Sequence, residues 1–205
     1  MKLPYGRAIV GLCLSWMLSG ELHAGVIYSN LGAGDSFIIN REYDVNSNFM
    51  ATPFVTTGGG NLADIRTPMF SLNNPVTLGL YTDSGGIPGT LLEGWTATVP
   101  GVPGILTTLT SEQHPLLSAD TPYWLVITVN QAQKLHLAWY QNSQGFLGGI
   151  FESNDLNHWL QFVPDSPAPA IELTSIASVP EPSALMLLGS GLLVLAVCGG
   201  KKTTG

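Results

Sequence analysis

Cysteine is nearly absent from this chain. Its 205 residues include two cysteines, Cys13 and Cys198, and each lies in an apolar stretch close to one end. The part between them, residues 25–177, has no cysteine, which excludes a disulfide framework and a cysteine-ligated metal site there. A domain in this part must be held by packing and hydrogen bonds alone. It is long enough to bury a real hydrophobic core, so we expect one domain over residues 25–177.

Charge is also scarce, and positive charge is scarcest. Charged residues make up 10% of the chain, and the formal net charge is −7. Between residues 25 and 179 the only lysines and arginines are Arg41, Arg66 and Lys134. Nucleic-acid binding depends on neutralising phosphates with clustered cations. The sequence therefore argues against nucleic acid as a partner.

Helical periodicity is the third feature that is missing between residues 25 and 179. Apolar residues there alternate with polar ones, and many of the 24 glycines and 14 prolines fall between the alternating runs as turn formers. Many short strands separated by such turns are typical of an all-β fold, an antiparallel β-sandwich or jelly roll. The predicted strands are 26–28, 49–55, 62–72, 76–81, 91–99, 105–110, 123–129, 135–140, 159–163 and 171–176.

The run 123–129 is the most apolar of these strands. It is rich in β-branched and aromatic residues and has little polarity in either phase, which predicts a central strand buried on both faces. We expect strand 135–140 to be its hairpin partner, joined through residues 130–133. Residues 165–169 have the composition of a linker, but an alternating run follows them, so we expect the last strand at 171–176.

The last 28 residues are organised differently. An uncharged apolar run begins at Ala184, and Lys201 and Lys202 follow it. The run is short and reaches the length of a membrane span only if Ser183 and the two glycines after Cys198 are counted. We expect a single transmembrane helix over about residues 184–200, with the two lysines on the cytoplasmic side. Pro180 and Pro182 cannot lie inside a helix, so Pro180-Glu181-Pro182 should be extended and accessible just outside the membrane. A buried C-terminal helix of a soluble domain is the alternative.

The first 24 residues have the layout of a secretory signal peptide. Lys2 and Arg7 are followed by an apolar stretch and by Leu22-His23-Ala24. We expect signal peptidase to cut between Ala24 and Gly25. An uncleaved anchor is the alternative.

These C-terminal features together resemble the PEP-CTERM sorting signal, over residues 178–202. The resemblance rests on Pro180, Glu181 and Pro182, on the apolar span and on the basic pair Lys201 and Lys202. It implies an exported protein of a Gram-negative bacterium that makes exopolysaccharide. It also implies transient anchoring in the inner membrane and processing by an exosortase, a membrane-embedded transpeptidase-like protease.

A second resemblance concerns the predicted β-domain. Residues 29–37, the D-x-G-G-x-P-G turn at 83–89 and the strand 117–125 resemble the choice-of-anchor exported β-domains, type R in particular. This group is defined by its anchors, so the resemblance implies a fold and no activity.

Aromatic residues give the strongest candidates for a binding site. Trp139, Tyr140 and Trp159 are the ones that we expect to be exposed, where they could stack on the sugar rings of a polysaccharide. Core packing is the alternative, because aromatic side chains bury the most area. Trp124 is assigned to the core.

Catalytic and metal-binding constellations are weak. Ser153, Asp155 and His158 are close in sequence, but hydrolase triads are assembled from distant segments and no G-x-S-x-G elbow is present. No pair of acidic residues can be placed at a glycosidase separation by spacing. His114, His136 and His158 lack zinc-ligand spacing. We expect no enzyme, cofactor or metal site, with loop calcium on Asp35, Asp44, Asp83 and Asp165 left as an alternative.

The sequence thus predicts an exported β-sandwich, delivered to the cell surface or extracellular matrix after C-terminal processing. We expect a structural or adhesive component of exopolysaccharide or biofilm. A carbohydrate-binding module is the second hypothesis, and a matrix polysaccharide hydrolase is the third.

Overall fold

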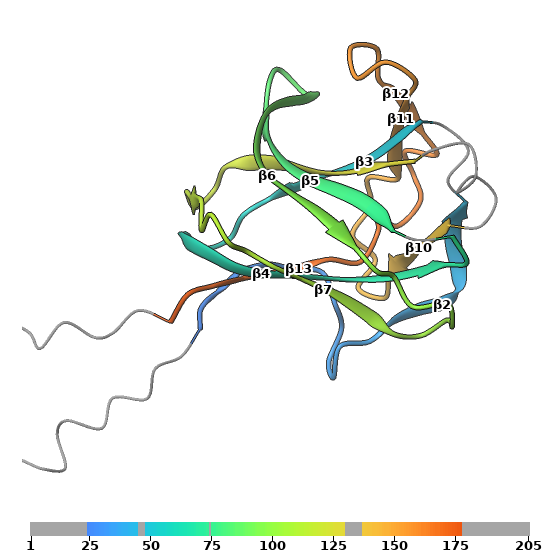
Figure 1. Ribbon diagram of the computed structural model, residues 1–205, viewed down its shortest axis with the longest axis horizontal. Helices are drawn as coiled ribbons and strands as arrows, with labels where there is room; N and C mark the ends of the chain where they lie inside the picture. The colour runs from blue at the N-terminus through green and yellow to red at the C-terminus, as the bar shows by residue number, and fades with distance from the viewer. Residues whose placement is uncertain (1–23, 45–47, 74, 130–136, 178–205) are drawn as a thin grey trace, which may run out of the picture. The chain divides into compact units, whose positions relative to one another are not determined.

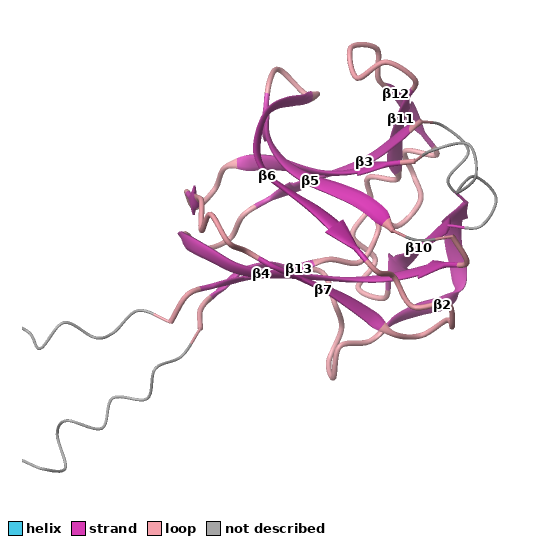
Figure 2. Ribbon diagram, in the orientation of Figure 1, coloured by secondary structure: helices cyan, strands magenta, loops and turns pink. Residues whose placement is uncertain are grey.

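The computed structural model describes residues 24–44, 48–73, 75–129 and 137–177, and these residues form an all-β domain with no helix (Figures 1 and 2). Its compact unit runs from Ala24 to Ile176. The strands are β1 (Val26–Ser29), β2 (Phe37–Asp44), β3 (Phe49–Val55), β4 (Gly60–Ser71), β5 (Val76–Asp83), β6 (Pro88–Ala97), β7 (Leu106–Thr110), β8 (Leu116–Leu117), β9 (Pro122–Thr128), β10 (Leu137–Asn142), β11 (Ile150–Ser153), β12 (Leu160–Phe162) and β13 (Glu172–Ser175).

The first sheet is built around the long strand β4. It has the order β1-β13-β4-β10-β2, and β7 and β8 also pair with β4. The N-terminal half of β4 pairs with β13, and its last three residues pair with β10. Every named pairing in this sheet is antiparallel, as the sequence predicts.

The second sheet has the order β12-β11-β3-β9-β5-β6 and is also antiparallel. Strand β9 lies at its centre, between β3 and β5. Residues Tyr123–Ile127 are buried one after another, so the prediction of a central strand covered on both faces is confirmed.

The two sheets pack face to face over one hydrophobic core, which makes the fold a β-sandwich. Leu62, Ile65 and Met69 of β4 enter this core from the first sheet. Leu78 and Leu80 of β5 enter it from the second sheet, together with inward residues of β3 and β9. Alternate residues of each strand supply it, because successive side chains of a strand point to opposite faces.

Strand β10 is not the partner of β9, and the expected hairpin is wrong. Instead β10 lies in the other sheet, between β4 and β2. Residues 165–169, which have the composition of a linker, also belong to the fold. Ala170 N–H donates to Tyr140 O at 2.9 Å, and Asn142 N–H donates to Ala168 O at 2.9 Å, so residues 168–170 extend the pairing along β10. Three further strands, β2, β8 and β11, have no counterpart among the predicted ones.

The first and last strands are neighbours. Gly25 N–H donates to the hydroxyl of Ser175 at 3.0 Å, and Ser175 N–H donates to Gly25 O at 2.7 Å. Strand β1 therefore begins where β13 ends, and the chain enters and leaves the sandwich at one place (Figure 1). Residues 1–23 of the predicted signal peptide (1–24) and the predicted helix at 184–200 lie outside the described residues. Within the described part, no helix is long and apolar enough to cross a membrane.

Candidate functional site

Trp139 is a core residue and not a surface platform. It is 0% exposed, and its indole N–H donates to the hydroxyl of Thr67 at 2.7 Å. That hydroxyl donates onward to Ala170 O at 2.8 Å. The expected exposure of Trp139 is therefore wrong, because its side chain enters the space between the two sheets.

Tyr140 faces the opposite way from Trp139 and is also buried, at 3% exposure. Its ring centroid lies 5.7 Å from that of Phe37 on the neighbouring strand β2. Burial and the Glu42 carboxylate raise the pKa of its phenol. Its expected exposure is wrong as well, because β10 is covered on both faces.

Trp159 is the one predicted aromatic that keeps partial exposure. It packs on the outer face of the second sheet, the face turned away from the sandwich core. There Trp124, Val126 and Ala51 form a small buried cluster, and Trp159 contacts it together with Phe49, Tyr81 and Phe151. Trp124 is buried as expected, but it belongs to this outer cluster.

The outer-face aromatic cluster (Phe49, Tyr81, Trp124, Phe151, Trp159) is held in a fixed arrangement. The rings of Trp124 and Phe151 meet edge to face, with centroids 4.9 Å apart. The indole N–H of Trp124 donates to the Asp83 carboxylate at 2.8 Å. A Cβ on Gly79 would lie 2.7 Å from the Tyr81 ring, so glycine lets that ring lie flat over the strand.

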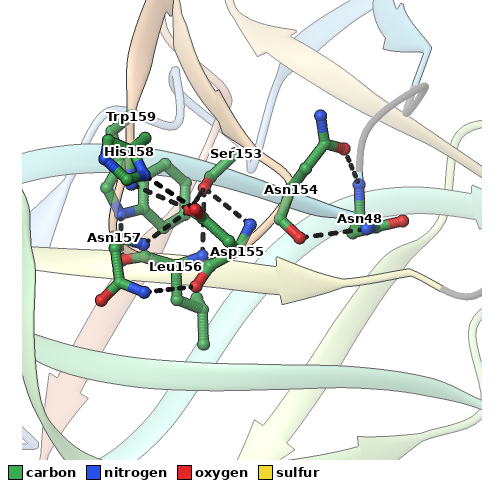
Figure 3. A network of polar contacts seen from close by, with 8 residues as sticks. All are labelled: Asn48, Ser153, Asn154, Asp155, Leu156, Asn157, His158 and Trp159. Atoms are coloured by element: carbon green, nitrogen blue, oxygen red, sulfur yellow. Dashed lines mark hydrogen bonds and ion pairs between the residues drawn. The ribbon is translucent and has the colours of Figure 1, made fainter.

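The loop between β11 and β12, which leads to Trp159 of this cluster, is held by a network of polar contacts (Figure 3). Asp155 is its central acceptor: the N–H groups of Asn157 and His158 each donate to its carboxylate at 2.9 Å. His158 Nδ1 lies 2.7 Å from the other carboxylate oxygen. Together these donors hold the pKa of Asp155 well below its usual range, with the His158 ring as the largest cause.

Ser153, Asp155 and His158 do meet in space, but not in the order that catalysis requires. The Ser153 hydroxyl lies 3.3 Å from the Asp155 carboxylate and accepts the N–H groups of Asp155 and Leu156. The carboxylate thus stands between the serine and the histidine. A nucleophile needs the base itself as its hydrogen-bond partner. The arrangement is that of a self-capped loop.

The same loop is fixed to the body of the second sheet. The Asn48 amide donates to Asn154 O at 3.1 Å, just before β3 begins. The indole N–H of Trp159 donates to Leu156 O at 2.9 Å. The loop therefore has a defined position beside β12.

An open groove follows this loop and strand β12. Its first part, about 540 Å³, is lined by Glu152, Ser153, Asn154, Asp155, His158, Leu160 and Phe162. Its second part, about 400 Å³, is lined by Glu42, Tyr43, Asp44, Ile150, Glu152 and Phe162. Glu152 and Phe162 belong to both parts, so one groove extends from the β11–β12 loop to β2.

Other acidic residues have structural partners elsewhere in the domain. The buried carboxylate of Glu93 accepts the Ser111 hydroxyl at 2.5 Å and the Glu112 N–H at 2.7 Å. Asp35 makes a two-bond ion pair with Arg66, which also binds Glu172. These contacts raise the pKa of Arg66, with Asp35 as the largest cause.

The two predicted processing sites lie, in sequence, next to the two ends of the domain. One is the signal-peptidase site between Ala24 and Gly25, and the other is the C-terminal sorting motif. Residues 178–202 match the family model of the PEP-CTERM protein-sorting motif. The match covers Pro180, Glu181, Pro182 and the pair Lys201 and Lys202, all of which lie outside the described residues.

A PEP-CTERM motif implies an exported protein with a membrane-anchored C-terminus that an exosortase processes. The motif begins at residue 178, directly after the described domain, whose last hydrogen-bonded residue is Ile176. Ala24 is exposed, and Gly25, the residue before β1, is hydrogen-bonded to Ser175 of β13.

Comparisons of the chain with curated proteins and with solved structures gave no match. The resemblance of the β-domain to the type R choice-of-anchor group thus stays a prediction.

Proposed function

We propose that this chain is a non-enzymatic β-sandwich protein that is exported, processed at its PEP-CTERM motif and retained as a structural or adhesive component of the extracellular matrix. The observation that carries the proposal is the motif match at residues 178–202. Its position fits removal without damage to the domain, because Ile176, the last residue of the described domain with a hydrogen bond to the body, precedes the motif. Exopolysaccharide is the matrix polymer that the motif's family suggests.

The cluster of Ser153, Asp155 and His158 lacks the serine–histidine contact that would activate a nucleophile, and this supports a non-enzymatic role. Ser153 is hydrogen-bonded to Asp155 and to backbone, and His158 binds the far side of the same carboxylate. Glu93 is buried, and its carboxylate accepts hydrogen bonds from the loop after β7. Within the described residues these groups stabilise loops.

The experiment that tests sorting replaces Pro180, Glu181 and Pro182 by alanine in the producing bacterium. We expect an unprocessed chain that stays in the inner membrane, measured by cell fractionation and by mass spectrometry of both ends of the protein. The matched control replaces Thr203 and Thr204, which lie just outside the matched residues, and should be processed normally. Unchanged processing of the triple variant would show that the motif does not direct sorting.

The same mass spectrum tests the N-terminal prediction. We expect the mature protein to begin at Gly25, after cleavage by signal peptidase. The new amino group would lie beside Ser175 Oγ, which already accepts the Gly25 N–H. A mature chain that begins elsewhere would overturn the cleavage site and leave the C-terminal proposal standing.

A second candidate function is glycan binding, favoured by the outer-face aromatic cluster. Sandwich faces that expose aromatic rings can stack on sugars, and Trp159 is the partly exposed indole of this cluster. Loss of binding to exopolysaccharide on Trp159→Ala would support it, with Leu116→Ser as a surface control on the other sheet. Equal retention of both variants on the polymer would exclude this site.

A further inference from the structure

Three large apolar side chains are exposed where the chain enters and leaves the sandwich. Leu116 is 72% exposed, Val26 is 54% exposed and Ile176 is 43% exposed. The residues next to them in the same strands are buried: Ile27, Leu117 and Ser175. Because successive side chains of a strand point to opposite faces, the three exposed ones lie on the outer face of the first sheet.

These three side chains lie close together across neighbouring strands. Ile176 N–H donates to Asn61 O at 2.8 Å, and Asn61 pairs with Leu116 on its other side. Ile176 and Leu116 are thus two strand spacings apart, about 10 Å. Val26 pairs with Thr174, two residues before Ile176. Val26, Leu116 and Ile176 therefore form one surface, which we call the exit patch.

The exit patch adjoins the segment that leads to the predicted membrane anchor. Seven residues, 177–183, separate Ile176 from Ala184, where the apolar run within the sorting motif begins. Fully extended, this stretch can span at most about 29 Å. A compact domain of this size is about 40 Å across. While the anchor is in the membrane, the patch therefore stays within a domain's width of the bilayer.

A tether of this length makes a weak contact effective. A short link between two binding partners gives an effective concentration in the millimolar range. Three exposed side chains could not hold a free domain on a bilayer, because even a single acyl chain gives only marginal, reversible membrane binding. Charge does not assist, since the chain has a net charge of −7. The fitting partner is thus the apolar region of a lipid surface, and not its anionic headgroups.

We propose that the exit patch rests on the lipid bilayer while the C-terminal segment anchors the chain, and that the contact is lost once the domain is separated from that segment. This contact rests on the proposed anchoring at the sorting motif, and it adds to that proposal the surface through which the domain meets the membrane. It also orients the domain: the end of β4 at Gly60 faces the bilayer, and the end at Ser71 faces away.

A second copy of this chain is a poorer occupant of the exit patch. A stable interface buries about 800 Å² on each partner, which is far more than three partly exposed side chains supply. Two patches in contact would also bring together two domains of an acidic chain, and like charges that face one another oppose association. Self-association is therefore the outcome that the test must separate.

The test uses the chain made in a bacterium without an exosortase, so that residues 178–205 stay attached, and reconstituted in phosphatidylcholine vesicles. Cys13→Ala and Cys198→Ala remove the native thiols, and Leu116→Cys then carries a fluorophore. Lipids with a spin label near the headgroup quench a fluorophore that touches the bilayer. We expect the label at residue 116 to be quenched.

Leu72→Cys provides the matched control. Leu72 is 61% exposed, close to the value for Leu116, and it directly follows β4. Leu116 pairs with Asn61 near the start of the same 12-residue strand, so the two labels are about 36 Å apart along it. The label at residue 72 should not be quenched.

Two changes should reduce the quenching at residue 116 by different routes. Val26→Ser combined with Ile176→Ser removes apolar surface from the patch, and most of the quenching should be lost; near-ultraviolet circular dichroism checks that this variant is folded. An insertion of about 40 glycine and serine residues after Ala177 leaves the domain untouched and should lower the effective concentration about tenfold. Cutting a protease site within that insertion should release the domain from the vesicles.

The remaining outcomes overturn the proposal. Equal quenching at residues 116 and 72, or none at 116 in a chain that floats with the vesicles, would refute the contact and leave the sorting proposal standing. A chain that does not float would overturn both, because the C-terminal segment would not be an anchor. Quenching that survives the insertion and the cut would show that the tether is not needed. A label at 116 that is shielded without quenching, and only at high protein-to-lipid ratio, would place a second copy on the patch.

Discussion

The indole N–H of Trp139 donates a 2.7 Å hydrogen bond to the hydroxyl of Thr67, and this contact joins β10 to β4 inside the sandwich. Thr67 passes the interaction on to Ala170 O, at 2.8 Å. One buried hydroxyl thus satisfies a donor on one side and an acceptor on the other. Three segments that are far apart in the sequence depend on it.

Thr67→Val keeps the shape of the side chain and removes both bonds. It leaves the Trp139 N–H and the Ala170 carbonyl unpaired in a buried place, and we expect a loss of about 2–4 kcal/mol in the free energy of unfolding. Urea denaturation followed by tryptophan fluorescence measures it. Thr77→Val, on the exposed side of β5, should change stability by less than about 0.5 kcal/mol.

Adding Trp139→Phe to Thr67→Val sharpens the same test. The double variant lacks the unpaired indole donor, so its loss should be smaller than the sum of the two single losses. Strict additivity would show that the Trp139–Thr67 bond does not contribute.

Trp139 also shows what the sequence could not predict. Period-two alternation assigns residues to faces, but it does not say which faces other segments will cover. The run 165–169 has the composition of a linker, yet Ala168 accepts a bond from Asn142, and Pro169 accepts one from Asn30. Because segments distant in sequence cover β10, Trp139 and Tyr140 are buried, although both were expected to be exposed.

Strand pairing is the second feature that the sequence could not predict. The all-β class and the burial of β9 followed from composition, because aromatic and β-branched residues filled both phases of that strand. Pairing with the next strand in sequence is only the commonest choice, and β10 crosses to the other sheet. Strand β2 was missed because Asn40, Arg41 and Glu42 interrupt its apolar pattern.

Glu93→Ala tests the buried carboxylate that holds the loop after β7. Ser111, Glu112 and Gln113 would lose their acceptor, and we expect a loss of about 2–4 kcal/mol in the free energy of unfolding. Amide hydrogen exchange should quicken at Glu112 and Gln113. Glu112→Ala removes an exposed carboxylate in the same loop and is the control. Similar losses in both variants would contradict the role of Glu93.

Two glycines at positive φ form a matched pair. Gly145, at φ +75°, has nothing within 4 Å of a Cβ, so Gly145→Ala should cost about 1 kcal/mol from the backbone alone. Gly149, at φ +56°, would place a Cβ 2.3 Å from Val163 O. Gly149→Ala must shift that backbone and should cost at least about twice as much. Thermal unfolding compares them, and equal costs would mean that the backbone around Val163 yields freely.

The pH dependence of the β11–β12 loop follows from Asp155. The pKa of its carboxyl is lower in the folded chain than in the unfolded one, where it is about 3.9. Its stabilising effect is therefore complete above the unfolded value and is lost as the pH falls through the folded one. Carbon NMR of the carboxyl group in an acid titration should find Asp155 still ionised where ordinary aspartates are half protonated.

His158→Ala should move the pKa of Asp155 back up, because the ring is the largest cause of its shift. Asn157→Ala removes a side-chain amide that donates to the Asp155 carbonyl and not to its carboxylate, and should leave the titration in place. An Asp155 that titrates normally in the unmutated chain would refute this account of the loop.

The adjacency of Gly25 and Ser175 has a mechanical consequence. Tension applied between the two ends of the domain would open β1 from β13 one bond at a time, because antiparallel strands loaded at the same end unzip. If signal peptidase removes residues 1–24, force can no longer be applied to β1 through a preceding segment of the chain. Drag on the domain would then enter through β13 alone, which is paired with β4 on one side and β1 on the other.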